Sequence, residues 1–340
     1  MSISHIGTVA RLELTQRLRS VGWYVLLGIF AVVLLGVTLL SFAVFSGQDA
    51  PGAGVYSVVV NLVLLLVVLV SPTLSGNAIN GDREAATLAP VQMTMASTGD
   101  IMLGKLIAAV ATGGAFLAVA LPFLAVALLG GGVPPATFAV SVLVLAAEIV
   151  VVAAIGVGFS GIVARPLFSI AATYLTVAAL VIGTLIAFGL GGAAIRTESV
   201  SYQRPWDEQT GEPVCDEWEE FPYEVPRYDL VWGLLAANPF IVLADATPVE
   251  FDPNGYPVDL FGQLKVGVRA AQHAPIEQRW DACSPNGQQG PTPEQMVADS
   301  VPSWFVGLGI QVLLAGGLFA GAWARTRTPA RRLPPGTRIA

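Results

Sequence analysis

Charged residues are scarce in this sequence. Only 12% of the 340 residues are Asp, Glu, Lys or Arg, and 54% are hydrophobic. A soluble domain of this size has about 25% charged residues. Together with a mean hydropathy of +0.68, this composition excludes a water-exposed globular surface and indicates an integral membrane protein.

Histidine and cysteine are also rare, with two of each. His5 lies near the N-terminus and His273 in a long polar interval, and only one carboxylate lies within the long apolar segments. These groups are too few to assemble a hydrolase active site, and two cysteines with one nearby histidine make a poor metal site. We therefore expect no catalytic, cofactor-binding or metal-binding residues.

Long apolar runs are what the sequence has in abundance. A helix needs about 20 apolar residues to cross a bilayer, and the runs lack the alternation typical of a membrane β-barrel. We expect an all-α integral membrane protein with a six-helix transmembrane bundle. The first run is too long for the apolar part of a signal peptide, so we expect it to be retained. The six runs are Gly22–Phe45, Tyr56–Ile79, Leu106–Leu129, Pro135–Val163, Pro166–Gly192 and Pro302–Ala324.

Basic residues near the ends of these runs predict the orientation, because Lys and Arg are retained on the cytoplasmic side. The two short loops on the opposite side contain neither. Both termini are expected in the cytoplasm of a multi-pass protein of the cell membrane. The orienting residues are Arg11, Arg17, Arg19, Arg83, Lys105, Arg165, Arg325, Arg327, Arg331, Arg332 and Arg338.

Five parts follow from this topology. They are an amphipathic cytoplasmic N-terminal helix (1–21), five transmembrane helices (22–192) with a cytoplasmic segment at 80–105, a long extracytoplasmic insertion (193–301), the sixth helix (302–324) and a basic cytoplasmic tail (325–340).

The expected extracytoplasmic region contains both cysteines, Cys215 and Cys283. Oxidation is permitted there, so one disulfide is expected, with two free thiols as the alternative. The acidic run around Asp216–Glu224 is interpreted as solvated surface. Residues 228–246 are apolar but interrupted by Asn238-Pro239, which is typical of an interfacial or re-entrant segment.

Glu148 is the one carboxylate in an expected transmembrane helix. Ionisable residues at such depth are costly and often functional. We interpret Glu148 as a protonated or hydrogen-bonded contact between helices, with a place in a translocation path as the alternative. Its expected partners are Asn61, Thr173 or Gln311.

The segment Gly99–Lys105 has the glycine and lysine spacing of a phosphate-binding loop. Leu106 follows where Ser or Thr is needed for magnesium, and the segment opens a transmembrane helix, so nucleotide binding is not expected. A short helix is expected earlier, with charges at Asp82–Glu84 and an apolar end at Leu88. Thr98 or Gly99 is expected to cap the next helix, where Asp100 favours the helix N-terminus.

At these residues the chain resembles permease subunits of ABC-2 type transporters, in particular the multi-copper-enzyme maturation and sodium or drug efflux permeases. Asp82-Arg83-Glu84, Thr87-Leu88 and Ile101-Met102-Leu103-Gly104-Lys105 carry the resemblance, which extends to Glu13, Arg19 and Asn238-Pro239-Phe240. Ala86 replaces a usual Gly, and the spacer Gln92–Met95 is unusual.

The resemblance implies a non-catalytic subunit that exports an unknown substrate and pairs with a second copy or a sister permease in the bilayer. ATP and Mg would be bound by a separate cytoplasmic ABC ATPase, and no nucleic acid partner is expected. The residues implied in ATPase coupling are Asp82, Arg83, Glu84, Thr87, Leu88, Ile101, Gly104 and Lys105.

Two other functions remain open at this stage. The extracytoplasmic region could make the chain a membrane-anchored sensor or scaffold. The chain could instead be an ion-coupled secondary transporter with Glu148 as the coupling group, although the inverted repeats of such proteins are not visible.

Overall fold

The computed structural model describes residues 2–48, 50–88, 96–207, 210–284, 288–289 and 291–327. The chain divides into two compact units, residues 1–180 with 308–340, and residues 181–307. Within the described ranges, six helices are long and apolar enough to cross a membrane. The six predicted spans are confirmed as helices.

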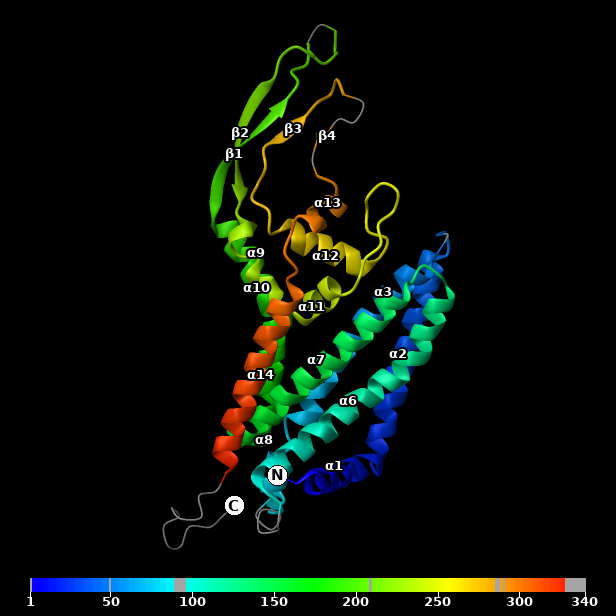
Figure 1. Ribbon diagram of the computed structural model, residues 1–340, viewed down its shortest axis with the longest axis vertical. Coiled ribbons are helices and arrows are strands. Elements are labelled where there is room, and N and C mark those ends of the chain that lie inside the picture. The colour runs from blue at the N-terminus through cyan, green and yellow to red at the C-terminus, as the bar shows by residue number, and fades with distance from the viewer. Residues whose placement is uncertain are drawn as a thin grey trace. The chain divides into compact units, whose positions relative to one another are not determined.

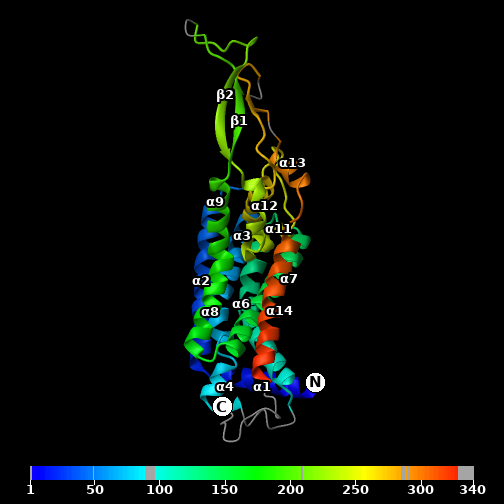
Figure 2. The ribbon, with the colours of Figure 1, turned by 90° about the vertical axis from the view of Figure 1, so that its left-hand side faces the viewer.

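The first unit is helical. Figure 2 shows its long helices α2, α3, α6 and α7 running along a common direction, and Figure 1 shows α1 lying across the end of α2. The fifth span is α8, a π-helical turn η1 and α9 in succession, and the last residues of this span and the first of α14 belong to the second unit. The helices are α1 Ile3–Leu18, α2 Val21–Phe45, α3 Gly52–Ser75, α4 Asn80–Glu84, α6 Thr98–Leu129, α7 Pro135–Ile162, α8 Pro166–Ala178, η1 Ala179–Gly183, α9 Thr184–Ala194 and α14 Trp304–Thr326.

Helix α6 begins eight residues before the apolar run that predicted it, at Thr98 rather than Leu106. Ser97 is the N-cap, and its Oγ accepts a hydrogen bond from the Asp100 backbone nitrogen at 3.2 Å. The Asp100 carboxylate accepts in return from the Ser97 nitrogen at 2.9 Å. The predicted cap at Thr98 or Gly99 is wrong, because this reciprocal box satisfies the free N–H groups one residue earlier.

Glycines of α7 allow neighbouring helices to approach closely. A Cβ on Gly156 would lie 1.9 Å from the Ser75 Oγ of α3, and one on Gly158 would lie 2.8 Å from the Leu318 Cβ of α14. Near the other end of α3 and α7, the buried Tyr56 hydroxyl and Ser141 Oγ are 2.7 Å apart. Small residues thus provide the dense packing that holds apolar helices together in lipid.

The second unit contains a four-stranded sheet, which the expected all-α class did not include. The strand order is β2-β1-β3-β4, with β1 antiparallel to β2 and parallel to β3. Because the two longest strands contain several β-branched and aromatic residues, they favour extended structure. The elements are β1 Arg196–Gln203, β2 Glu219–Pro226, η2 Tyr228–Leu230, α10 Gly233–Ala236, α11 Pro239–Ala246, α12 Leu260–Ala270, β3 Gln278–Trp280, β4 Gln288–Gln289 and α13 Pro293–Ala298.

Buried ionic groups organise the helices of this unit. The Asp245 carboxylate on α11 accepts hydrogen bonds from the Arg269 Nε of α12 and from the Ser303 backbone nitrogen, both at 2.6 Å. The Asn238 side chain caps α11 by accepting from the Phe240 nitrogen at 3.0 Å. Asn238-Pro239 therefore starts a helix, so the break that the sequence predicted there is a helix boundary.

Candidate functional site

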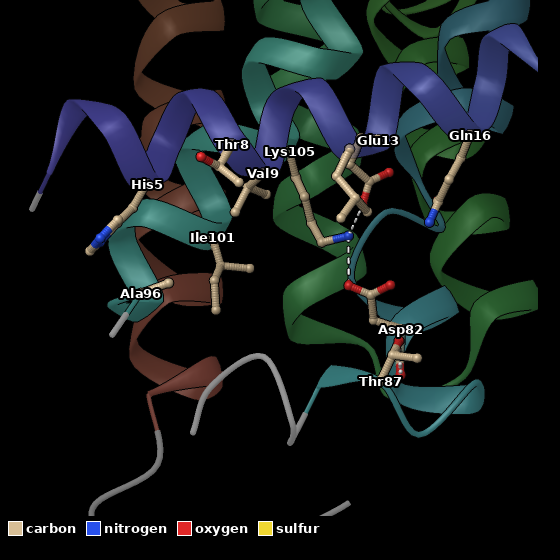
Figure 3. Close-up of a pocket in the computed structure, with 11 residues that line it drawn as sticks. His5, Thr8, Val9, Glu13, Gln16, Asp82, Thr87, Ala96, Ile101 and Lys105 are labelled. Carbon is tan, nitrogen blue, oxygen red and sulfur yellow. Dashed lines mark hydrogen bonds and ion pairs between the residues drawn. The ribbon is translucent and has the colours of Figure 1, made fainter. Parts of the chain in front are cut away.

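Lys105, in the second turn of α6, is the centre of a charged cluster. Its side chain is only 2% exposed, and its ammonium contacts the carboxylates of Glu13 on α1 and Asp82 on α4. The distance from Nζ to the Asp82 Oδ2 is 2.7 Å, and Figure 3 shows both carboxylates meeting the lysine. A buried ammonium requires such partners, so Lys105 joins three helices that are separate in the sequence.

Gly104 explains how α1 comes close enough for this contact. A Cβ at Gly104 would lie 2.6 Å from the Val9 Cβ, closer than real Cβ contacts allow. The absence of a side chain lets α1 cross α6 closely, and the adjacent Lys105 then reaches Glu13.

Arg17 provides a second anchor for α1. Its Nη1 donates to the Thr112 Oγ1 of α6 at 2.7 Å, and its Nη2 donates to the Leu74 carbonyl oxygen of α3 at 2.8 Å. Burial lowers the pKa of the Arg17 guanidinium, and the nearby Glu13 carboxylate opposes this effect. The guanidinium therefore links α1 to both α6 and α3.

At the other end of α1, Asp100 binds the start of the helix. Its Oδ1 accepts from the Ser2 backbone nitrogen at 2.9 Å, and the His5 Nδ1 lies 3.8 Å from its Oδ2. Helix α1 is thus connected to α6 at its first residues, its middle and its last turn.

Arg83 on α4 turns toward α7. Its Nη2 donates to the Gly161 carbonyl oxygen at 3.1 Å, and its Nη1 donates to the Asn80 Oδ1 at 3.0 Å. Asn80 in turn donates to the Val163 carbonyl oxygen at 2.6 Å. These bonds satisfy carbonyls at the C-terminal end of α7, which lack partners within the helix.

The other predicted coupling residues divide into buried and exposed groups. Leu88 packs in a buried cluster with residues such as Met102 and Ala322, and Ile101 is also buried. Glu84 is the last residue of α4, Thr87 follows the end of this helix, and both are exposed. Residues 89–95, which include the unusual spacer, and 328–340 of the predicted tail lie outside the described residues.

A pocket of about 620 Å³ opens beside the charged cluster. Val9, Leu12 and Ile101 form part of its apolar wall, and Glu13, Asp82 and Lys105 line it with charge (Figure 3). Its volume falls in the range typical of ligand sites. Asp82, Ile101 and Lys105 were among the predicted site residues. His5 was not predicted as a lining residue, and no contact was predicted for Glu13. A lysine directly before the apolar run Leu106–Leu129 was the signal in the sequence for a nearby carboxylate partner.

Glu148 is fully buried in α7. Neither carboxyl oxygen has a hydrogen-bond partner among the described residues. Two predicted partners bond within their own helices, Asn61 to the Ser57 carbonyl oxygen and Thr173 to that of Ser169. Gln311 of α14, also fully buried, is the predicted partner whose side chain lies beside the Glu148 carboxyl group.

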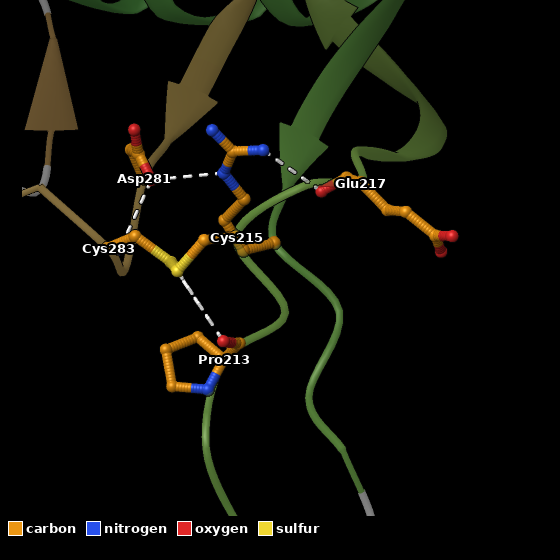
Figure 4. Close-up of a disulfide and its surroundings, with 6 residues drawn as sticks. Pro213, Cys215, Glu217, Asp281 and Cys283 are labelled. Carbon is orange, nitrogen blue, oxygen red and sulfur yellow. Dashed lines mark hydrogen bonds and ion pairs between the residues drawn. A yellow bond between two sulfur atoms is a disulfide. The ribbon is translucent and has the colours of Figure 1, made fainter.

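The predicted disulfide between Cys215 and Cys283 is present. Figure 4 shows it beside Asp281, whose Oδ1 accepts from the Cys283 nitrogen and from the Arg204 Nε, both at 3.1 Å. The Arg204 hydrogen bond lowers the pKa of the Asp281 carboxyl. The guanidinium also stacks on Trp218, 3.8 Å from its ring centroid. The neighbouring acidic run is exposed.

Within the described ranges, no group of three His, Cys, Asp or Glu is placed to hold a metal ion. The chain matches no protein-family model and no curated protein sequence.

Proposed function

We propose that the chain is the membrane-spanning permease subunit of an ABC-2 type transporter, with ATP hydrolysed by a separate ATPase subunit. The observation that carries the proposal is the attachment of α4. This short helix lies between two long apolar helices, is linked to α7 through Arg83 and to α6 through Asp82, and leaves Glu84 and Thr87 exposed.

A short helix attached in this way can pass a movement of a bound partner to the transmembrane helices. A partner that grips residues 84–87 would move α4 as a unit, because two charge-assisted contacts tie it to the bundle. Displacement of α4 would then act on α6 and α7 together. In this proposal, closure of an ATPase dimer rocks these helices and opens a path outward for a substrate, with both termini in the cytoplasm.

The segment with the spacing of a phosphate-binding loop, residues 99–105, does not form such a loop. Residues 99–105 form the first turns of α6, whereas a phosphate-binding loop precedes its helix and follows a strand. Gly104 and Lys105 instead make the contacts with α1 and α4. ATP hydrolysis therefore falls to the partner.

Affinity purification of the tagged chain from its native membranes in mild detergent tests the proposal. Mass spectrometry of the complex is expected to identify a stoichiometric ATPase subunit, and the complex is expected to hydrolyse ATP. Reproducible recovery of the folded chain without an ATPase would overturn the proposal and favour the sensor or scaffold function.

The role of α4 is tested by Glu84→Lys in the same experiment. Reversing this exposed charge is expected to lower ATPase recovery by about tenfold, equivalent to about 1.4 kcal/mol, without changing the melting temperature of the chain. Glu212→Lys, also at an exposed position, is the matched control and is expected to have no effect. Unchanged recovery with Glu84→Lys would show that α4 is not the docking element.

A further inference from the structure

The pocket beside Lys105 has the dimensions of a site for an organic molecule. Its lining residues on α1 run from His5 to Gln16, a distance of about 16 Å along a helix axis. Figure 3 shows Val9, Glu13 and Gln16 pointing toward the same side of α1, as their spacing of three or four residues requires. A volume of about 620 Å³ is far larger than an inorganic ion needs and falls within the range of small-molecule sites.

The charged part of this pocket has an excess of carboxylate. Glu13 and Asp82 share the single ammonium of Lys105, which they contact through Oε1 and Oδ2. In the part of the chain that the structure describes, the Glu13 Oε2 and the Asp82 Oδ1 accept no hydrogen bond. The guanidinium of Arg17 does not supply one, because it donates to Thr112 and to a backbone carbonyl. Since both carboxylates contact the same nitrogen, a single further cation can reach both.

The pocket also has an apolar part. Val9 and Leu12 of α1 and Ile101 of α6 line it, and Figure 3 shows Val9 and Ile101 between His5 and the charged cluster. Leu12 is 57% exposed, so an apolar occupant would remove some of its surface from water and gain free energy. The walls therefore match a molecule with a cationic end and an apolar body.

Other kinds of occupant match these walls less well. A metal ion would meet two carboxylates that already hold the Lys105 ammonium between them. An anion would be repelled by the excess negative charge. A neutral apolar molecule would offer no donor to the open carboxylate oxygens.

We propose that this pocket binds an organic ammonium ion that carries an apolar group. The N–H groups of the ion would donate to the open oxygens of Glu13 and Asp82, and such charge-assisted hydrogen bonds are about twice as strong as neutral ones. The apolar group would lie against Val9, Leu12 and Ile101. The bound ion would then connect α1, α4 and α6. This binding is independent of the proposed transport function.

Isothermal titration calorimetry of the full chain in phosphatidylcholine nanodiscs tests the proposal. This lipid has no N–H donor that would compete, and the heat of partition into empty nanodiscs is subtracted. The probes are phenylbutylamine and phenylbutanol, which share an apolar body and differ in charge. The amine is expected to bind about tenfold more tightly than the alcohol. Equal affinities, or no binding of the amine, would overturn the proposal.

Variants of the two carboxylates locate the binding. Glu13→Gln and Asp82→Asn each remove the excess charge, and each is expected to weaken amine binding about tenfold without changing alcohol binding. Glu84→Gln is the matched control, because Glu84 is an exposed acid on the same helix as Asp82 and is not a lining residue of the pocket. Amine affinity that survives both pocket variants would overturn the proposal. An equal loss in Glu84→Gln would overturn it too, since general surface charge would then attract the amine.

Lys105→Met gives a test with the opposite sign. Without the lysine ammonium both carboxylates are free for the probe, so phenylbutylamine is expected to raise the melting temperature of Lys105→Met by more than that of the wild type. Phenylbutanol is expected to shift both chains equally. If the amine also shifted both chains equally, it would not be binding at these carboxylates and the proposal would be wrong.

Discussion

The Asp82 carboxylate on α4 lies 2.7 Å from the Lys105 ammonium on α6. The same ammonium contacts Glu13, 92 residues earlier in the chain. The lysine is almost fully buried, whereas the two carboxylates keep 30% and 16% of their side-chain surface exposed. The single charge of Lys105 thus holds both α1 and α4 against α6.

Removing this charge should loosen both helices. Lys105→Met leaves two carboxylates close together without a cation, and we expect a loss of about 2 to 4 kcal/mol in unfolding free energy. Thermal unfolding in nanodiscs measures the effect. Adding Glu13→Gln and Asp82→Asn to Lys105→Met should restore most of the stability. If Lys105→Met alone were as stable as the wild type, the ion pairs would be dispensable for stability.

Gly104 and Gly114 form a matched pair on α6. Gly104→Ala places a methyl group against Val9 and should destabilise the packing of α1 by about 1 to 3 kcal/mol. Gly114 has open space around its Cβ position, so Gly114→Ala should be neutral or stabilising by up to about 1 kcal/mol. Melting temperatures of both variants, with protease cleavage within α1, test the prediction. Equal effects would contradict the close crossing of α1 and α6.

Glu148→Gln should leave the fold and its stability intact, because an amide has nearly the same shape and removes no hydrogen bond found among the described residues. Glu148→Ala should destabilise the bundle, because it leaves a cavity at a fully buried position. Size-exclusion profiles and melting temperatures compare the two variants. Transport that persists without ATP but collapses with the proton gradient or in Glu148→Gln would instead support an ion-coupled transporter.

The Arg204–Asp281 contact should depend on pH. Its hydrogen bond lowers the folded-state pKa of Asp281 below the usual carboxyl value of about 3.9. The contribution to stability is therefore present above that pH and is lost as the pH falls through the lower folded-state pKa. Asp281→Asn should lower the melting temperature at pH 7 and have a smaller effect near pH 3. An equal difference at both pH values would show that the carboxylate charge is not the cause.

The helical part of the fold was predictable to within a few residues at most helix ends. Spans such as Gly22–Phe45 and Pro135–Val163 are continuous apolar runs, and their limits follow from composition. The start of α6 was predicted one or two residues too late, because its cap was expected at Thr98 or Gly99 and lies at Ser97. The sheet was missed since β1 and β2 lie in a polar region and contain no long apolar run.

The candidate site was predictable in its residues but not in its geometry. Asp82, Arg83 and Lys105 stood out as charges beside apolar runs. Their directions depend on partners distant in the sequence: Arg83 turns to the end of α7, and Lys105 turns to Glu13. Local sequence contains no information on which of these groups faces inward.

The sequence alone determined that this is a protein with six membrane-spanning candidates, because the thickness of a bilayer requires apolar runs of that length. It also limited any disulfide to one pairing, since two cysteines allow one bridge, whereas the tertiary structure decided between that bridge and two free thiols. Only the tertiary structure decided which charges are buried and which are exposed. Helix crossing at Gly104 brings together groups that the chain separates, and their mutual distances set their electrostatics.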